Sequence, residues 1–464
     1  RIDEAFQPIS DFFSKYVFYP IGDYPFVIYL LVGSALFFTI YFGFPNLKYF
    51  WTAINVVRGK YDKLEKNDND SKDGEVSHFQ ALATAVSGTV GNGNIAGVAL
   101  AIALGGPGAT FWMIVCGLLG MSTKFVECTL GVYYRDVDED GVVYGGPMYY
   151  ISKGLKSKGF KTLGTIAASL FAIFCIGGSF GGGNAAQSNQ ATIVIKNLFG
   201  YESTFAGAMI GIVLATLVGI IIIGGIKRIA SVTEKVVPFM ALLYILACIY
   251  ILTINFWFID DAIALIIREA FNPTAVGVGG IIGVLMVGFQ RAAFSNEAGA
   301  GSASIAHSAV KTKYAASEGL VALLEPFIDT VVICTMTALV IITFNSTGAF
   351  VYGGDGMGGV MIDGVMYEGA GITQKAFAQY IPGSDIFLTI AVVLFAVSTM
   401  ISWSYYGLQS WKFLFGRGRV ADLTYKVLFL MFVVIGAAAS MNSIWAFSDA
   451  MIFAMVFPNM IGLY

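Results

Sequence analysis

The stretch SGTVGNGNIAG, from Ser87 to Gly97, places four glycines and two asparagines inside an otherwise apolar run. Each glycine costs a helix about 1 kcal/mol relative to alanine, so these residues oppose a continuous helix. Three structures are typical of such a pattern: a phosphate-binding loop, a helix packed closely through small residues, and a membrane helix interrupted partway across the bilayer. The rest of the chain decides among them.

The composition is that of a protein that crosses a membrane many times. Of the 464 residues, 57% are hydrophobic and 12% are charged, whereas soluble domains carry about 25% charged residues. Apolar runs of about 20 residues, the length that crosses a hydrocarbon core, recur along the sequence. The net charge is -3 and there is no basic stripe, so we expect the lipid bilayer as partner and no nucleic acid.

We predict an all-α polytopic membrane protein with eleven transmembrane helices. They cover residues 24–45, 82–104, 108–134, 163–197, 204–226, 229–255, 276–306, 316–345, 385–411, 420–441 and 443–464. Twenty lysines and arginines fall on one side of these spans and five on the other. Because basic residues mark the cytoplasmic side, we expect a cell-membrane protein with its N-terminus outside and its C-terminus in the cytoplasm.

A second interrupted stretch, GFQRAAFSNEAGAGSASIA from Gly288 to Ala306, begins the second half of the chain. Without the first span, ten spans divide into two groups of five, and an odd number per group inverts one group relative to the other. We therefore expect a 5+5 inverted repeat with two discontinuous helices. Its parts are an N-terminal segment with a peripheral helix and a cytoplasmic linker (1–78), a first repeat (79–258), an outer amphipathic helix (259–275) and a second repeat (276–464).

These patterns favour the interrupted membrane helix for Ser87 to Gly97. The phosphate-loop pattern is absent, and helix packing explains the glycines but not Asn92 and Asn94. An unwound segment exposes N–H groups that hold a carboxylate and carbonyl groups that hold a cation. Paired interruptions in inverted halves indicate the central binding site of a transporter.

Three motifs resemble the alanine/glycine:cation symporter family, also called the sodium:alanine symporter family. They are AVSGTVGNGNIAGVALAIALGGPGATFWM, GGPMYYI (Gly145 to Ile151) and FSNEAGAGSASIAHSA, and the resemblance extends over residues 80–450. This family shares the inverted five-plus-five fold of the bacterial leucine transporter, in the APC superfamily. The resemblance implies sodium-coupled symport of alanine and glycine into the cell by alternating access, in a monomer. The alternative is a symporter of the same fold for a different small solute, including a proton-coupled one.

The resemblance also implies a set of ligands along the first interruption. Backbone N–H groups of Asn92 and Gly93 would hold the substrate carboxylate, while the carbonyls of Ser87 and Val90 would face sodium. Asn94 would either contact the substrate or brace the interruption. The substrate-binding residues expected here are Thr89, Gly91, Asn92, Gly93 and Asn94.

The adjacent hydroxyls of Ser398 and Thr399, halfway along span 385–411, resemble the remaining sodium ligands. Neutral oxygen ligands suit a hard cation that must be released again. The alternative is that both hydroxyls bond carbonyls of their own helix, as is common in membrane helices.

Other candidates would line the pocket around the substrate. Phe180, Asn184 and Gln187 have helical spacing that predicts one shared face, with interhelical hydrogen bonding as the alternative to substrate binding for Asn184 and Gln187. Phe294 and Trp403 are bulky enough to exclude larger side chains, since overpacking a tight site costs about 1–3 kcal/mol.

Charged residues within the predicted spans must be paired or functional, because each costs about 2.5–3.5 kcal/mol at mid-membrane. For Arg291, Glu297 and Glu127 we expect internal ion pairs, with a substrate or proton role for Glu297 as the alternative. For His78 and His307 we expect solvated helix ends, with a proton relay as the alternative. Because an embedded enzyme needs converging catalytic groups, which this sequence does not place together, we do not predict an enzyme.

Overall fold

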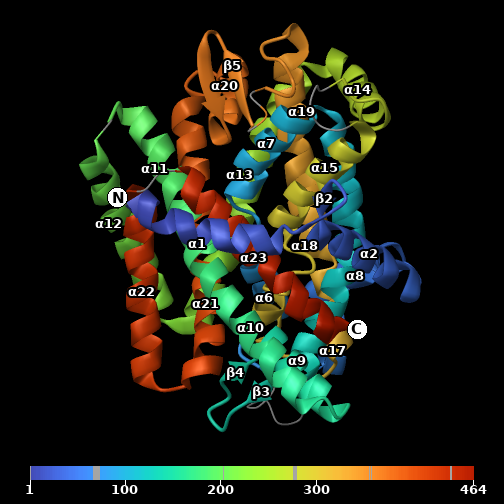
Figure 1. Cartoon of the computed structure of the whole chain (residues 1–464). Helices are drawn as coiled ribbons and strands as arrows, with labels where there is room; N and C mark the ends of the chain where they lie inside the picture. Colours follow the sequence, from blue (N-terminus) through green and yellow to red (C-terminus); the bar gives the residue numbers. More distant parts are fainter. Residues whose placement is uncertain are drawn as a thin grey trace.

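The computed structural model describes residues 2–65, 74–201, 203–274, 280–354, 356, 358–438 and 441–464. In these residues the chain forms a bundle of long helices with two ends (Figure 1). One end carries the antiparallel hairpin of β5 (Gly359–Ile362) and β6 (Val365–Glu368), and the other carries the hairpin of β3 (Asp136–Val137) and β4 (Val143–Tyr144). A third hairpin joins β1 (Pro20–Ile21) to β2 (Tyr24–Pro25).

The helices have the following bounds: α1 (Ile2–Val17), α2 (Phe26–Tyr41), α3 (Pro45–Lys48), α4 (Phe50–Val57), α5 (Asp62–Glu65), α6 (His78–Thr89), α7 (Ala96–Gly105), α8 (Gly108–Tyr133), α9 (Pro147–Ser157), α10 (Lys161–Phe180), α11 (Ala186–Phe199), α12 (Thr204–Ile222), α13 (Gly225–Ile254), α14 (Ile259–Phe271), α15 (Gly280–Asn296), α16 (Ala303–His307), α17 (Ala315–Ala322), α18 (Leu324–Pro326), α19 (Thr335–Phe344), α20 (Ala370–Tyr380), α21 (Ser384–Phe415), α22 (Arg419–Ala438) and α23 (Met441–Leu463). Short 3₁₀ turns lie at η1 (Asn92–Asn94), η3 (Phe256–Phe258) and η5 (Asn345–Thr347), and π-helical segments at η2 (Gly181–Ala185) and η4 (Phe327–Cys334).

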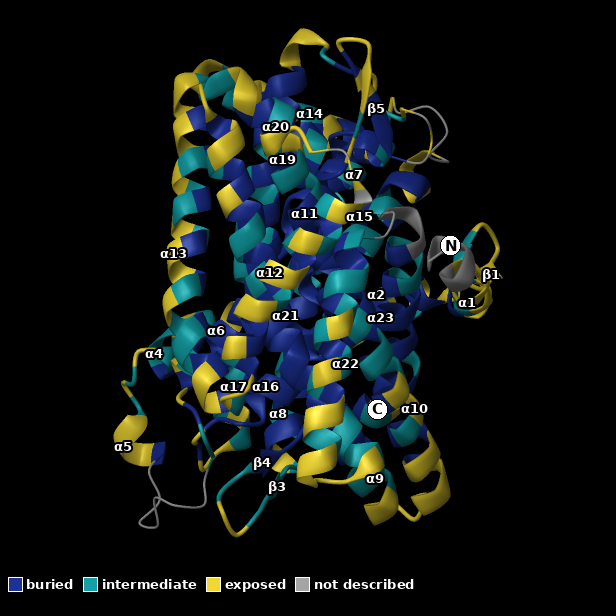
Figure 2. Ribbon diagram, turned by 90° about the vertical axis from the view of Figure 1, so that its left-hand side faces the viewer, coloured by how far each residue is buried: buried dark blue, intermediate teal, exposed yellow. Residues whose placement is uncertain are grey.

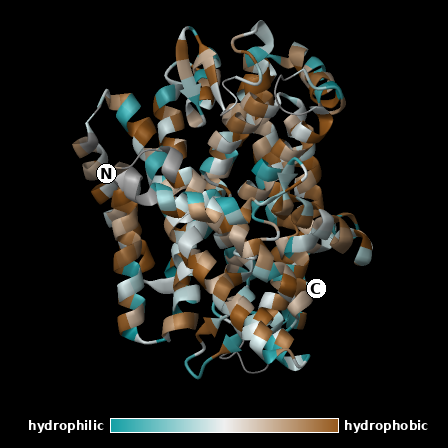
Figure 3. Cartoon of the chain, viewed as in Figure 1, coloured by the Kyte–Doolittle hydropathy of each residue, from teal (hydrophilic) through white to brown (hydrophobic). Residues whose placement is uncertain are grey.

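The polytopic architecture expected from the sequence is confirmed. In the described part of the chain, eight helices are long and apolar enough to cross a membrane, and the bent pair of α6 and α7 makes a ninth. α2 and α15 are shorter, at 16 and 17 residues, so the count of eleven stays a prediction. The outer faces of helices such as α22 are hydrophobic (Figure 3). Exposed side chains such as Val213, Phe239 and Leu242 need lipid around them.

Both interruptions lie where the sequence predicts them. α6 begins with a capping box, in which Ser77 Oγ accepts from the N–H of Gln80, and it ends at Thr89. The chain then bends by 57° through η1 before α7. After α15, left-handed backbone at Glu297 (φ 54°), Gly299 (φ 96°) and Gly301 (φ 85°) separates α15 from α16; such angles suit glycine and strain a glutamate.

Two features of the fold were not predicted from the sequence. α1, which no predicted span covers, lies across α23 (Figure 1). Lys124, counted above among the basic residues of the connecting segments, lies inside α8 with no exposed surface. Figure 2 shows buried residues filling the centre of the bundle and exposed ones along outer helices such as α13. The buried interior contains many polar side chains, and these form the candidate site.

Candidate functional site

The first interruption meets α21 at the two predicted hydroxyl residues. Thr399 Oγ1 donates to the carbonyl oxygen of Ser87 at 3.0 Å, and Ser87 Oγ donates to the carbonyl oxygen of Ser398 at 2.7 Å. Ser398 Oγ donates to Phe395 within its own helix at 2.9 Å, which is the alternative stated for this pair. All three residues are almost fully buried. Neutral oxygens from two elements therefore converge in the way that a hard cation requires.

Gly91 sits in the tightest part of this junction. A Cβ at Gly91 would lie 2.6 Å from Thr399 Oγ1 and 3.3 Å from Gln187 Oε1. Gln187 Oε1 accepts from the backbone N–H of Asn92 at 3.3 Å, and Gln187 Nε2 donates to the carbonyl oxygen of Gly182 at 3.0 Å. Gln187 therefore contacts the first interruption, while its expected role in substrate binding stays a prediction. Glycine at position 91 allows this close approach of Thr399 and Gln187.

The two asparagines of the interruption have different environments. Asn94 Oδ1 accepts from the N–H of Gly91 at 2.9 Å, so Asn94 braces the turn. Asn92 is fully buried, yet neither its Nδ2 nor its Oδ1 has a hydrogen-bond partner among the described residues. Thr89 Oγ1 lies 3.3 Å from the carbonyl of Val86 and 3.4 Å from that of Ala85, so it bonds its own helix. A buried amide without partners indicates a ligand-facing group.

Asp329, in η4, joins both interrupted helices. Its Oδ1 accepts from Asn94 Nδ2 at 2.7 Å, and its Oδ2 accepts from Ser295 Oγ at 2.9 Å and from Thr330 Oγ1 at 2.7 Å. Asp329 is fully buried. As an aspartate inside an apolar span, Asp329 is expected from the sequence to be paired internally, like the other buried charges, and among the described residues its partners are neutral donors. Its three neutral donors make it a clamp between the first interruption and α15.

The predicted shared face of Phe180, Asn184 and Gln187 is not what the structure shows. Phe180 stacks on Phe432 of α22 with ring centroids 4.7 Å apart, and Asn184 Nδ2 donates to the carbonyl of Phe429 at 2.7 Å. Gln187 instead contacts the first interruption. The π-helical segment η2 explains the difference, because its wider turn shifts the register that an α-helix would have kept. Asn184 therefore takes the interhelical role that was its alternative.

The two bulky candidates lie beside different interruptions. Phe294 approaches Gly93, where a Cβ would lie 3.8 Å from Phe294 Cδ1. Trp403 donates from Nε1 to Glu297 Oε1 at 3.1 Å, and its ring packs against Gly178 and Gly183. The structure thus brings Phe294 to the first interruption and Trp403 to the second.

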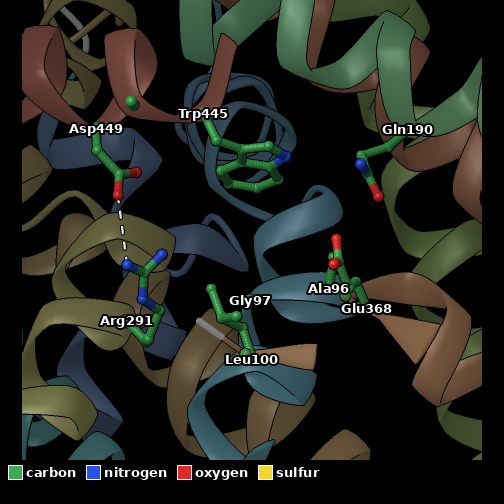
Figure 4. A pocket seen from close by; sticks show the side chains of 11 residues that line it. Ala96, Gly97, Leu100, Gln190, Arg291, Glu368, Trp445 and Asp449 are labelled. Carbon is green, nitrogen blue, oxygen red and sulfur yellow. Dashed lines mark hydrogen bonds and ion pairs between the residues drawn. The ribbon is translucent and has the colours of Figure 1, made fainter. Parts of the chain in front are cut away.

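A cavity of about 240 Å³ opens beside the first interruption towards the β5–β6 end (Figure 4). Its lining includes Gly97 of α7, Gln190 of α11, Glu368 of β6 and the ion pair of Arg291 with Asp449, 3.4 Å apart. The indole of Trp445 faces the cavity between Asp449 and Gln190 (Figure 4). Its ring centroid lies 5.4 Å from that of Phe294. Phe294 also approaches Gly93, so this aromatic pair lies between the Trp445 wall of the cavity and Gly93.

The expected ion pairs form for some of the buried charges only. Arg291 pairs with Asp449, and Glu325 pairs with Lys124 at 3.1 Å. Among the described residues, Glu297 is held instead by Trp403 and Ser302, and Glu127 by the N–H of Gly299 at 2.9 Å and by Asn459 at 2.8 Å. The expectation for Glu127 and Glu297 was therefore wrong: neutral donors replace cations there.

Neither histidine is a solvated helix end. His307 has no exposed surface and His78 is 7% exposed. Both lie between carboxylates, and His78 also contacts Glu65 outside the spans. Burial alone would raise the pKa of Glu65, but hydrogen bonds from His78 and Thr312 outweigh it and hold that pKa below its usual range. Sequence spacing could not show this, because the partners lie far apart along the chain.

Comparison with known proteins places these features in a family. The sequence model of the sodium:alanine symporter family matches residues 7–464. The sodium/alanine symporter AgcS of Methanococcus maripaludis is 39% identical over 440 residues, which cover 95% of this chain and 91% of that protein. The probable sodium/glutamine symporter GlnT of Bacillus subtilis is 32% identical over 440 residues, covering 94% of this chain and 84% of that protein.

Among solved structures, a manganese transporter of Eremococcus coleocola superposes with a TM-score of 0.54 at 12% identity, over 84% of this chain and 80% of that one. This likeness concerns the fold alone. The family match is far more specific, since it spans nearly the whole sequence and both interruptions. The chain therefore belongs to the sodium:alanine symporter family, whose members are membrane transporters rather than enzymes and carry sodium as the co-transported ion.

Proposed function

We propose that this protein carries alanine and glycine into the cell together with sodium, by alternating access. The observation that carries the proposal is the junction of the interrupted helix with α21, where Thr399 Oγ1 lies 3.0 Å from the carbonyl oxygen of Ser87. Sodium would be held by the carbonyls of Ser87 and Val90 and the hydroxyls of Ser398 and Thr399. The carbonyl of Ser87 and the hydroxyl of Thr399 are close enough to share one ion.

The substrate would bind along the same interrupted segment. Its carboxylate would meet the backbone N–H of Gly93 and the side chain of Asn92, whose amide atoms have no other partner among the described residues. Gln187 would turn from the N–H of Asn92 towards the substrate. Phe294, beside Gly93, would leave room for a methyl group or a hydrogen only, and an added side chain would meet a cost of about 1–3 kcal/mol.

Coupling follows if ion and substrate both order one interrupted helix. Each ligand then makes closure more favourable for the other, without direct contact between them. A membrane potential of about 100 mV adds about 2.3 kcal/mol for each sodium ion that enters. The inverted repeats, residues 79–258 and 276–464, would rock around this site, with the peripheral segment 1–78 and the helix within 259–275 outside them.

The orientation with the N-terminus outside makes the β5–β6 end extracellular. On this arrangement the cavity beside Gly97 is the entrance, and it is closed from the site by Phe294, Trp445 and the Arg291–Asp449 pair. The β3–β4 end, with most of the basic residues, faces the cytoplasm. The protein is proposed to work as a monomer.

The proposal predicts sodium-driven uptake of labelled alanine into proteoliposomes. We expect excess glycine to abolish the uptake of label, and excess leucine or glutamine to leave it within about twofold, because Phe294 would clash with longer side chains. The relation to a probable sodium/glutamine symporter makes glutamine the decisive competitor. Uptake that glutamine blocks as well as glycine does would instead favour a wider substrate range, and uptake indifferent to sodium would contradict the proposal.

A further inference from the structure

Six titratable side chains form one continuous buried chain near the β3–β4 end, which we call the imidazole cluster. They come from six segments, α5, α6, α17, α16, α18 and α8, and are at most 8% exposed. In order along the chain of contacts they are Glu65, His78, Glu318, His307, Glu325 and Lys124.

Each imidazole lies between two carboxylates. His78 contacts Glu65 through Nε2 at 2.5 Å and Glu318 through Nδ1. His307 contacts Glu318 through Nδ1 at 2.5 Å, and its Nε2 lies 3.6 Å from Glu325. His307 makes one hydrogen bond, from Nδ1 to Glu318; its Nε2 is too far from Glu325 for a hydrogen bond, so only the charge of Glu325 favours a proton there. Because an ionised carboxylate only accepts hydrogen bonds, His78, which is within hydrogen-bond distance of two carboxylates, needs a proton on both nitrogens. Only the imidazolium form has two.

The charge balance leads to the same result. With neutral imidazoles, three carboxylates and one ammonium leave two uncompensated negative charges in the buried cluster, which costs several kcal/mol. With two imidazolium rings the net charge is zero. The other titratable groups beside the cluster are mostly carboxyls rather than cations: Glu127 and Glu297 lie near Lys124, Asp329 near Glu325, and Glu234 bonds Gln80 on α6. The nearby cation Arg135 is engaged by the carbonyls of Ser308 and Val310.

The position of the cluster gives these protons a function. α6 and α16 are the halves of the two interrupted helices that point to the β3–β4 end, and the cluster ties them to each other through Glu318 of α17. Opening the transporter towards this end must part α6 from α16 and α17. We propose that the imidazole cluster binds two protons, one on each imidazole, and that these protons hold the cytoplasmic end of the transporter closed.

The direction of the pH effect follows from the charges. The imidazolium–carboxylate contacts are complete at low pH and are lost as the pH rises, because neutral rings leave the carboxylates uncompensated. Cytoplasmic alkalinisation beyond about pH 8 should therefore favour opening to the cytoplasm, whereas acidification below that pH, where both rings are already charged, should leave it unchanged. The position and role of the gate rest on the proposed function; the presence of the two protons does not.

The protonation of the two rings can be measured directly, because the sequence contains two histidines, His78 and His307, and both belong to the cluster. Solid-state NMR of ¹⁵N-histidine-labelled protein in proteoliposomes should show both rings doubly protonated at about pH 8, far above the usual midpoint of about 6.5. In His307→Gln one ring remains, which assigns the signals. In Glu318→Gln both rings should lose their protons between about pH 6 and 7. Neutral rings in the unmodified protein at about pH 7.5 would overturn the inference.

A transport measurement tests the gate. Alanine exchange across liposomes should speed up several-fold when the side facing the β3–β4 end is brought from about pH 8, where both rings are charged, to about pH 10, and Glu318→Gln, whose rings are already neutral at about pH 8, should flatten this dependence. Asp136→Asn is the matched control: Asp136 lies at the same end but pairs at the surface with Lys153 and Arg417, so its loss should leave the pH profile unchanged. A flattened profile in Asp136→Asn, or an unaltered one in Glu318→Gln, would contradict the gate. Neutral rings with intact sodium-coupled uptake would refute the inference alone, whereas charged rings without sodium coupling would refute the proposed function alone.

Discussion

Thr399→Val should raise the sodium concentration that half-saturates alanine uptake by about tenfold. Valine keeps the shape of threonine but removes the hydroxyl, which lies 3.0 Å from the carbonyl oxygen of Ser87. If this oxygen ligand contributes about 1.4 kcal/mol to sodium binding, its loss makes the binding of sodium tenfold weaker. The measurement is the initial rate of alanine uptake into proteoliposomes as external sodium is varied, at saturating alanine.

Thr399→Ser is the matched control, because it restores a hydroxyl at the same place and should return the sodium dependence to within about threefold. Ser398→Ala should have a smaller effect than Thr399→Val, since Ser398 Oγ already bonds the carbonyl of Phe395. An unchanged sodium dependence in Thr399→Val would show that this hydroxyl only stabilises the contact between α6 and α21.

Asp329→Asn should lower alanine uptake about a hundredfold and reduce the free energy of unfolding by at least 2 kcal/mol. The carboxylate accepts hydrogen bonds from Asn94, Ser295 and Thr330. Asparagine keeps one acceptor oxygen and turns an N–H₂ group towards the remaining donors. A buried donor left without an acceptor costs about 1–3 kcal/mol. The first interruption then loses the group that orients Asn94, and with it the brace on Gly91.

Two variants separate this clamp from a general loss of stability. Thr330→Ala removes one donor to Asp329 and the acceptor of Asn296 Nδ2, but leaves the contacts from Asn94 and Ser295 in place, so uptake should fall less than about fivefold. Asp363→Asn makes the same chemical change at an exposed turn of the β5–β6 hairpin and should change neither property. Thermal unfolding of purified protein and uptake at matched protein density provide the two measurements. Normal uptake by Asp329→Asn would show that the interruptions need no clamp.

The features that depend on local pattern could be predicted from the sequence. Four glycines near Asn92 located the first interruption, and the stretch Gly288 to Ala306 contains the second, although its first half, to Asn296, is helical in α15. The paired hydroxyls of Ser398 and Thr399 were found because the resemblance singled them out. In each case the deciding information lies within one short stretch. Helix propensity and apolar periodicity act over that same range.

The features that could not be predicted from the sequence depend on long-range packing or on backbone register. Asn94 binds Asp329, 235 residues further along, so no spacing could show that it braces rather than binds substrate. A π-helical segment turned Asn184 towards α22, away from Gln187. Lys124 was predicted to lie near a loop, because its partner Glu325 is 201 residues away in the sequence. The sequence shows that charged residues inside apolar spans must be paired or functional, but it does not show which residues are their partners.

Alanine-driven entry of ²²Na⁺ tests the central claim most directly. Proteoliposomes without a membrane potential should take up ²²Na⁺ several-fold faster when alanine is added outside, and glycine should act in the same way. Thr399→Val should show a several-fold weaker stimulation at sodium concentrations near the half-saturation of the unmodified protein. Alanine entry that brings in no ²²Na⁺ would contradict the account, because the interrupted helix would then bind substrate without coupling it to the ion.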